Sequence, residues 1–274
     1  MDITAIESFA LNSEAGLRFG CFAAIFALMC LWEIASPRRP SGAGKAQRWL
    51  NNIALLLVNS LLLRLLFPAA AVGLAFAVGE RGWGLFNNVE LPFWLEVALA
   101  VLLLDLAIYL QHRLMHRVPM LWRLHRVHHA DLEIDLTTGS RFHTLEILLS
   151  MLIKWLVIAL LGPALLAVLV FEILLNGMAI FNHANVRLPA GLDRVLRVLL
   201  ITPDVHRVHH SVIPVETDSN FGFNLSIWDR LFGTYIAQPR AGHTGMTIGL
   251  AEFRDPGQVA RLPGMLMLPF VKTP

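Results

Sequence analysis

The chain has 274 residues, of which 56% are hydrophobic and only 15% charged, and its mean hydropathy is +0.60. This composition excludes an ordinary soluble domain and favours a protein embedded in a membrane. The formal net charge is +2 and no long basic run occurs, so the sequence does not favour nucleic-acid binding. Both cysteines, Cys21 and Cys30, lie in an apolar stretch. Any metal ion would therefore have to rely on His, Asp, Glu or Asn.

Four apolar regions are expected to supply the membrane-spanning helices: residues 19–35, 53–79, 92–110 and 145–181. As one helix, the last region would be about 55 Å long at about 1.5 Å per residue, against a hydrocarbon core of about 30 Å. Gly162 and Pro163 lie near its middle, so we predict two antiparallel helices there. Because Arg64 weakens the second region, the expected number of spans is four or five.

The distribution of basic residues predicts the orientation of these spans. Residues 1–17 contain no Lys or Arg, and segment 80–91 contains only Arg81. The loop 37–51 contains Arg38, Arg39, Lys45 and Arg48. The positive-inside rule therefore places this loop in the cytoplasm and the N-terminus outside. The acidic N-terminus lacks the basic region of a secretory signal, so the first span is expected to be retained.

These spans divide the chain into four segments. We predict N-terminal transmembrane helices in residues 1–110, a first cytoplasmic histidine segment in 111–144, a transmembrane hairpin in 145–181 and a cytoplasmic cap in 182–274. All eleven histidines then lie on the cytoplasmic side or at the interface. The expected fold is all-α, with a cytoplasmic helical cap that carries a histidine-rich site for two metal ions.

The histidines form three motifs with helical spacing. His112 and His116 end the third apolar region four residues apart, and the pattern H-x-x-H-H occurs at both 125–129 and 206–210. Offsets of 0, 3 and 4 place the imidazoles of each motif on one stripe of a helix. Solvated histidines on amphipathic helices are the alternative, but imidazoles have no packing advantage over leucine and would repel one another when protonated.

The ligand type narrows the choice of metal. Without thiolates, the site suits iron or zinc better than copper or manganese, and ligand chemistry alone leaves that choice open. Eight or more histidines exceed what one ion uses, since zinc takes about four ligands. Two ions at a reactive centre are therefore implied.

The three motifs, together with segments 141–143, 181–185 and 220–235, resemble the fatty acid hydroxylase and sterol desaturase superfamily over about residues 95–236. The resemblance, to its bacterial sterol desaturase type, implies two iron ions, with zinc as the alternative occupant. The resemblance further implies that the enzyme uses O2 to hydroxylate or desaturate an acyl chain, ether lipid, sterol or isoprenoid. Without a cytochrome-like or flavin motif in the chain, electrons are expected from an external cytochrome or ferredoxin with its reductase. The expected location is a bacterial inner membrane.

The resemblance also implies a ligand set. The nine implied metal ligands are His112, His116, His125, His128, His129, His183, His206, His209 and His210. The further candidates, each a ligand or a group bonded to one, are His143, Asp105 and Asn185. The chain departs from the family pattern at Thr144, where proline is frequent, and at 182–185, where a histidine pair is frequent. An ion pair with Arg64 is the alternative role of Asp105.

Other polar residues have simpler expected roles. Asp131, Asp204 and Glu146 could each cap a helix or orient an imidazole, and capping is the expected role of Asp131 and Asp204. Glu172 is expected to face a polar cavity or a charged partner. The arginines between the motifs are expected to contact lipid headgroups, namely Arg113, Arg117, Arg123, Arg126 and Arg207. His243 is expected at the surface, and the apolar residues of 225–232 on an interfacial helix.

Two other functions use similar residues. A dinuclear zinc hydrolase acting on lipids also uses imidazoles, but it usually adds bridging carboxylates, and the three motifs contain no Asp or Glu. A metal transporter would place its polar ligands in mid-span, whereas these histidines lie at the ends of the spans. We therefore predict a membrane oxidoreductase.

Overall fold

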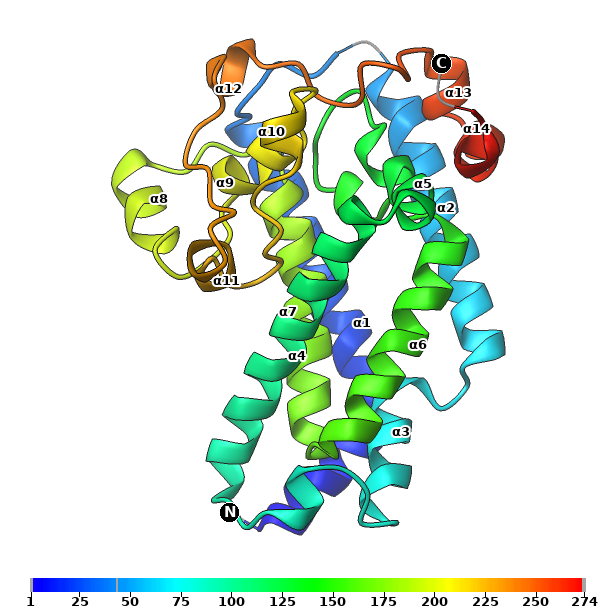
Figure 1. The fold of residues 1–274 in the computed structure, drawn as a ribbon, viewed down its shortest axis with the longest axis vertical. Helices are drawn as coiled ribbons and strands as arrows, with labels where there is room; N and C mark the ends of the chain where they lie inside the picture. Colours follow the sequence, from blue (N-terminus) through cyan, green and yellow to red (C-terminus); the bar gives the residue numbers. More distant parts are fainter. Residues whose placement is uncertain (1, 43, 273–274) are drawn as a thin grey trace.

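The computed structural model describes residues 2–42 and 44–272, and it contains helices but no β-strand in these ranges. A bundle of long helices forms the lower part of Figure 1: α1 (Ile3–Ala35), α2 (Lys45–Leu66), α3 (Ala70–Gly79), α4 (Phe93–Arg117), α6 (Thr144–Leu161) and α7 (Leu165–His183). Short elements form a cap above it: α5 (Pro119–His129), α8 (Ala190–Leu196), α9 (Pro203–His209), α10 (Pro214–Thr217), α11 (Ile227–Leu231), α12 (Gly242–Gly245), α13 (Pro256–Val259) and α14 (Leu262–Met267). The 3-10 turns are η1 (Phe86–Asn88), η2 (Thr138–Ser140) and η3 (Leu268–Phe270).

Five helical segments of the bundle are long and apolar enough to cross a membrane, with α2 and α3 counted as one. This agrees with the expected all-helical membrane fold. Large apolar side chains point outward from the bundle, including Phe19 (73% exposed), Ile34 (70%) and Leu160 (64%). Such exposure would be costly in water but is favourable against lipid. The first span begins at Ile3, well before the expected apolar region.

The second span is broken between α2 and α3. Pro68 lies in the break and has no N–H to continue a helix. Trp155 of α6 packs its ring against Phe67 at 4.9 Å and donates a hydrogen bond to the carbonyl of Ala70. Arg64 is exposed in the last turn of α2. The break therefore has an aromatic partner inside the bundle.

The hairpin of α6 and α7 turns where the sequence predicts it. Gly162 follows α6 with φ of +59°, and Pro163 precedes α7. A Cβ atom at Gly162 would lie 2.2 Å from the carbonyl oxygen of Trp83. Leu85 also donates a backbone hydrogen bond to Leu160 across this contact. The turn thus requires glycine for both its conformation and its close approach to the loop before α4.

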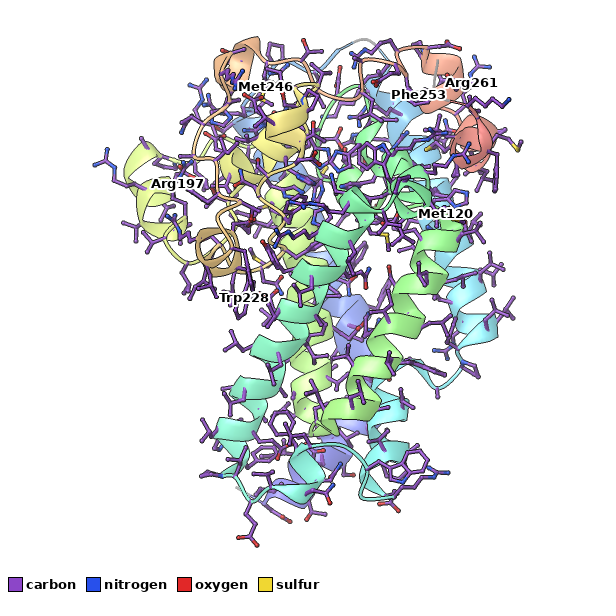
Figure 2. The ribbon with its side chains drawn as sticks, viewed as in Figure 1. Met120, Arg197, Trp228, Met246, Phe253 and Arg261 are labelled. Atoms are coloured by element: carbon purple, nitrogen blue, oxygen red, sulfur yellow. The ribbon has the colours of Figure 1, made fainter. Side chains whose placement is uncertain are left out.

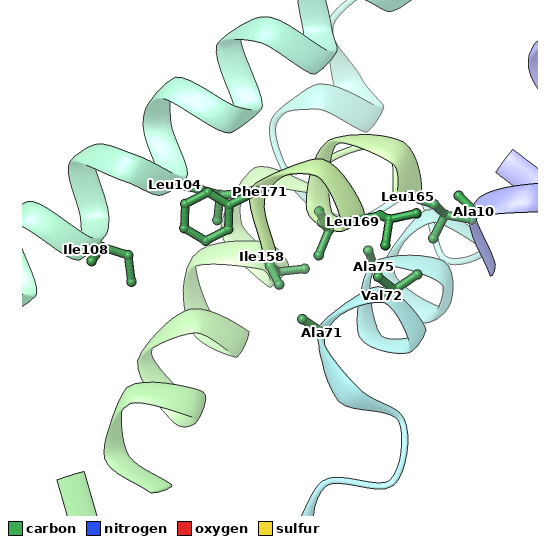
Figure 3. Packing of buried hydrophobic residues seen from close by; sticks show 11 residues of the cluster. Ala10, Ala71, Val72, Ala75, Leu104, Ile108, Ile158, Leu165, Leu169 and Phe171 are labelled. Carbon is green, nitrogen blue, oxygen red and sulfur yellow. The ribbon is translucent and has the colours of Figure 1, made fainter. Parts of the chain in front are cut away.

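Helix α7 is the central span of the bundle. Its residues Phe171 and Leu169 pack with Leu104 of α4, Ile158 of α6 and the small residues of α3 (Figure 3). More than half of its apolar window is buried, compared with a third or less in the other spans. The helix ends at His183, so the best-packed span positions one of the candidate ligands.

All nine candidate ligands lie at one end of the bundle. The C-terminal ends of α1, α4 and α7 and the N-terminal ends of α2 and α6 meet the cap there (Figure 1). Figure 2 shows nitrogen-bearing side chains gathered at the same end. The start of α1 and the loop before α4 lie at the opposite end. The alternation of spans is as predicted, and the cytoplasmic position of the cap remains a prediction.

We expect Gly162→Ala to destabilise the protein. Alanine would have to adopt a positive φ, which costs about 1–2 kcal/mol, and its methyl group would collide with the carbonyl of Trp83. The melting temperature of the purified protein in detergent should fall by about 4 °C or more. Gly16→Ala is the matched control, since a Cβ atom at Gly16 in α1 meets nothing within 4 Å. Equal melting temperatures for the two variants would contradict this account of the turn.

Candidate metal centre

Nine histidines converge at the junction of the bundle and the cap. They form two groups in which the ligand atoms of each group lie within 4.8 Å of one another. The first group contains His112, His116, His125, His129 and His209. The second contains His128, His183, His206 and His210. These are the nine residues implied by the resemblance, and the structure places all of them together.

Each H-x-x-H-H motif contributes to both groups. In α5, His125 and His129 join the first group while His128 joins the second. In the motif at α9 the order is reversed: His206 and His210 join the second group while His209 joins the first. Positions i and i+4 thus face one group and position i+3 faces the other. The remaining ligand atoms come from α4 for the first group and from α7 for the second.

In the first group, backbone carbonyls and a carboxylate determine which imidazole nitrogen carries the proton. Nδ1 of His112 donates to the carbonyl of Phe221 at 2.7 Å, and Nδ1 of His209 donates to that of Ser219 at 2.7 Å. Their Nε2 atoms therefore carry lone pairs. These two Nε2 atoms lie 3.0 Å apart, and Nε2 of His125 lies 3.1 Å from that of His112.

The second group has the same arrangement. Nδ1 of His183 donates to the carbonyl of Ala179 at 2.7 Å, and Nδ1 of His128 lies 3.3 Å from the carbonyl oxygen of Arg141. The Nε2 atoms of these two residues are 3.1 Å apart, and Nε2 of His206 lies 3.0 Å from that of His183. Facing lone pairs repel one another unless a cation lies between them. Both groups therefore fit a metal ion.

The nearest Nε2 atoms of each group lie 3.0 to 3.1 Å apart, a separation suited to neighbouring ligands of one ion at about 2.1 Å from each nitrogen. The first group also offers five imidazoles, one more than a tetrahedral zinc ion uses.

The cap keeps the imidazoles neutral. Burial, reinforced by the neighbouring rings, lowers the pKa of His209 to about 3. The same causes lower the pKa of His128, His129, His206 and His210 well below the ordinary value. Neutral imidazole is the form that binds metal ions. These side chains are therefore ready to bind metal at neutral pH without first losing a proton.

Carboxylates contact the ligands from outside the groups. Glu146 of α6, which is 3% exposed, accepts a hydrogen bond of 2.6 Å from Nδ1 of His125. Asp218 lies 3.2 Å from Nδ1 of His116. Of the two expected roles of Glu146, the structure thus favours orienting an imidazole. Asp218 was not singled out in the sequence, because no spacing links it to His116.

Asp229 is a second residue that the sequence analysis did not single out. It accepts hydrogen bonds of 2.8 Å from the backbone N–H groups of Phe221 and Gly222. This holds the carbonyl of Phe221 in position for His112. The segment 220–235 was noted only for its resemblance, and its role depends on a backbone loop that sequence spacing does not reveal.

The arginines beside the motifs are not all at headgroup depth. Arg126 and Arg207 are 1% and 0% exposed, so the prediction that they contact lipid was wrong. Arg126 donates to the carbonyls of Leu268 and Val271, and Arg207 donates to Asp204 and to the carbonyl of Ala184. They are buried because the cap and the C-terminal segment cover the side of each helix opposite the imidazoles.

Asp131 and Asp204 do not cap helices, so that prediction was also wrong. Asp131 forms an ion pair of 2.7 Å with Arg48 of α2 and accepts from Thr138. Asp204 lies inside the first turn of α9 and pairs with Arg38 and Arg207. Both carboxylates link the histidine segments to the loop between α1 and α2 or to α2 itself.

The three further candidates lie outside both histidine groups. His143 precedes α6, where its Nδ1 accepts from the N–H of Leu145 and its Nε2 lies 3.2 Å from the carbonyl of Leu266. The side-chain amide of Asn185 is bonded to the backbone N–H and carbonyl of Arg39. These contacts turn both side chains toward the surrounding backbone.

Asp105 accepts a hydrogen bond of 2.9 Å from the indole N–H of Trp228, which lies on the underside of the cap (Figure 2). It forms no described ion pair with Arg64, which is exposed. Trp228 is buried while Leu231 is 68% exposed, so α11 has one packed side and one open apolar side. The hydrogen bond between Trp228 and Asp105 joins α11 to α4 and does not orient a histidine.

His243 and Glu172 are both buried, and only the burial of Glu172 among charged partners was expected. His243 is 5% exposed and lies 3.4 Å from Asp204, so its predicted surface position was wrong. Burial lowers its pKa to about 4. Glu172 is buried between Lys154 and Arg18, at 2.5 and 2.8 Å, as expected for a charge inside a span.

A cavity of about 270 Å³ extends from the histidines into the bundle. His112 and His125 form part of its wall, followed by apolar residues such as Phe142, Met151 and Leu175. Glu172, Lys154 and Arg18 also line it. We call this space the bundle cavity. Its position allows a lipid chain to reach the first histidine group, at His112 and His125, from within the bundle.

The fold and the two histidine groups define a helical membrane protein with a site suited to two metal ions. Residues 97–234 match the fatty acid hydroxylase family, and the chain belongs to this family. An ornithine lipid hydroxylase of Rhizobium tropici is 32% identical over 57% of the chain and 46% of its own length. An alkylglycerol monooxygenase of Xenopus tropicalis is 31% identical over 65% of the chain and 39% of its own length. The chain thus matches less than half of these relatives, and no solved structure matches it.

We expect His209→Ala and His128→Ala to lower metal content well below two ions per chain. Each variant removes one imidazole from its group, so the ion of that group loses one of its nitrogen ligands. His143→Ala is the matched control and should retain the full metal content, because it lies outside both groups. Elemental analysis of the purified variants measures the difference. Full metal content in both ligand variants would rule out the site.

We also expect Glu146→Ala to weaken metal binding by about 10–100-fold, because His125 loses the carboxylate that orients it. The rate of metal loss to a chelator measures this effect. Glu146→Gln retains an acceptor oxygen and should lose metal more slowly than the alanine variant. Identical rates for the wild type and Glu146→Ala would show that the carboxylate has no such role.

Proposed function

We propose that this protein is an O2-dependent lipid hydroxylase or desaturase with two iron ions bound by its nine clustered histidines. The observation that carries the proposal is the pair of imidazole groups, whose Nε2 atoms face one another at 3.0 to 3.1 Å at the end of the bundle cavity. This places the metal chemistry where a lipid chain can reach it. Family membership supports the same reaction class.

Iron is the proposed metal because the groups offer five and four imidazoles and contain no carboxylate. Imidazole suits iron, and a five-ligand group exceeds the need of tetrahedral zinc. The bound irons would supply the reductive activation of O2 that oxidation of an unactivated C–H bond requires. Hydroxylation then consumes O2, two electrons and two protons, and gives the alcohol and one water.

The protein's own residues orient the ligands and exclude water. Carbonyls of Phe221 and Ser219 hold the proton on Nδ1 of His112 and His209, which directs their lone pairs into the first group. The rings of Phe142 and Phe223 line the bundle cavity beside the histidines. The ring of Phe142 stacks on His128 at 4.4 Å. An apolar wall of this kind holds an alkyl chain and limits the entry of water.

The proposed substrate is a membrane lipid with an alkyl or acyl chain. The matched relatives include hydroxylases named for ornithine lipid, for alkylglycerol and, in the rat, for cholesterol at 26% identity. The activity that these names share is the oxygenation of a lipid. Electrons would come from a separate cytochrome or ferredoxin, and the site would face the cytoplasm, as the basic loop 37–51 predicts.

The test uses protein purified without oxygen and loaded with ferrous iron. We expect two irons per chain. In a host that expresses the chain, mass spectrometry should find a lipid that is heavier by one oxygen or lighter by two hydrogens. A host that expresses His209→Ala should lack this lipid, and one that expresses His143→Ala should retain it.

Two zinc ions per chain with lipid turnover in the absence of O2 would instead identify a hydrolase. Two irons per chain without any oxidised lipid in several hosts would contradict a lipid substrate.

A further inference from the structure

Three charged residues from three different spans meet inside the bundle. Glu172 of α7, which is 2% exposed, pairs with Lys154 of α6 at 2.5 Å and with Arg18 of α1 at 2.8 Å. Arg18 also pairs with Glu14 at 2.6 Å. Each of the three lies near the middle of its span, where charges are costly. Apolar packing alone would join the spans at lower cost.

All three residues line the bundle cavity, whose opposite end is formed by His112 and His125. Lys154 follows Glu146, the partner of His125, by two turns of α6, which is about 12 Å at about 1.5 Å per residue. The wall between the two ends includes Ile108, Ile147, Met151 and Leu175. The cavity therefore has a histidine end, an apolar middle and an ionic end.

The ionic end offers more N–H donors than the ion pair between Lys154 and Glu172 uses. The Lys154 ammonium has three N–H donors, and Glu172 accepts from it. Two cations face two carboxylates when Glu14 is included, so the cluster is balanced in charge. A further anion would disturb this balance, whereas an uncharged oxygen would accept a hydrogen bond without adding charge.

We propose that Lys154 and Arg18 bind an uncharged oxygen-bearing group of the substrate, such as a hydroxyl, at the end of the bundle cavity away from the histidines. This inference rests on the proposed function. It defines the substrate as a lipid whose polar oxygen and oxidised carbon are separated by an apolar stretch of chain, since about two turns of α6 lie between Lys154 and Glu146. Binding at both ends would place one stretch of the chain beside the histidines and so select the position of oxidation.

The experiment measures binding, not turnover. Iron-loaded protein in detergent micelles is titrated with 1-dodecanol, dodecanoate and dodecane, and native mass spectrometry counts the bound molecules. We expect wild-type protein to bind 1-dodecanol about tenfold more tightly than dodecane, as for one hydrogen bond to a charged donor. Lys154→Met should remove this preference and leave dodecane binding unchanged.

Two further variants keep the test decisive. The double variant Lys154→Met, Glu172→Gln preserves the charge balance and leaves Arg18 paired with Glu14, so it is used if the single variant fails to fold. Arg64→Gln is the matched control, because Arg64 is an exposed cation of α2 that is not among the residues lining the cavity. It should retain the preference for the alcohol.

Equal binding of 1-dodecanol and dodecane to the wild type would overturn the proposal. So would an equal loss of both in the Lys154 variants, which would show that the cluster only joins the helices. Tighter binding of dodecanoate than of 1-dodecanol would overturn the assignment to an uncharged group. Because binding requires neither O2 nor electrons, a protein that binds the alcohol selectively but oxidises no lipid would refute the proposed function alone.

Discussion

The structure depends on one electrostatic constraint, the mutual repulsion of buried imidazole lone pairs. Carbonyls on one side of His112, His183 and His209 hold the proton on Nδ1, so that Nε2 of each ring faces another Nε2 within 3.1 Å. Without a cation, each such contact would be unfavourable and each buried nitrogen would lack a partner. The interior of the cap is therefore suited to positive ions and not to an apolar core.

The surrounding fold meets this constraint with rigid elements. His112 and His183 end two long spans, and α7, which carries His183, is the most buried span of the bundle. The two H-x-x-H-H helices lie above these ends, and each contributes to both groups. Because positions i, i+3 and i+4 on a helix are fixed relative to one another, each of these helices holds the two groups side by side.

Hydropathy and helical spacing are local properties, so the sequence alone predicted the spans, the hairpin turn and three histidine motifs, whereas the inclusion of His183 in the ligand set came from the resemblance to a family. The sequence did not predict how the motifs divide between the groups, since the direction of α5 relative to α9 depends on tertiary packing. It also placed Arg126, Arg207 and His243 at the surface. Arg126 is buried against the C-terminal carbonyls of Leu268 and Val271. Arg207 and His243 are buried beside Asp204. Charge patterns alone cannot distinguish a headgroup contact from a buried pair.

The C-terminal segment lies beyond the matched family region, yet it binds directly to the α5 motif. Arg126 donates to the carbonyls of Leu268 and Val271 at 2.5 Å, and Arg141, whose own carbonyl lies beside His128, donates to that of Val259. A label attached to the segment around Val271 would therefore lie beside the bonds that hold the α5 motif. The opposite end of the molecule, where α1 begins, is remote from the histidines (Figure 1). The start of α1 is therefore a safer position for a label than the segment around Val271.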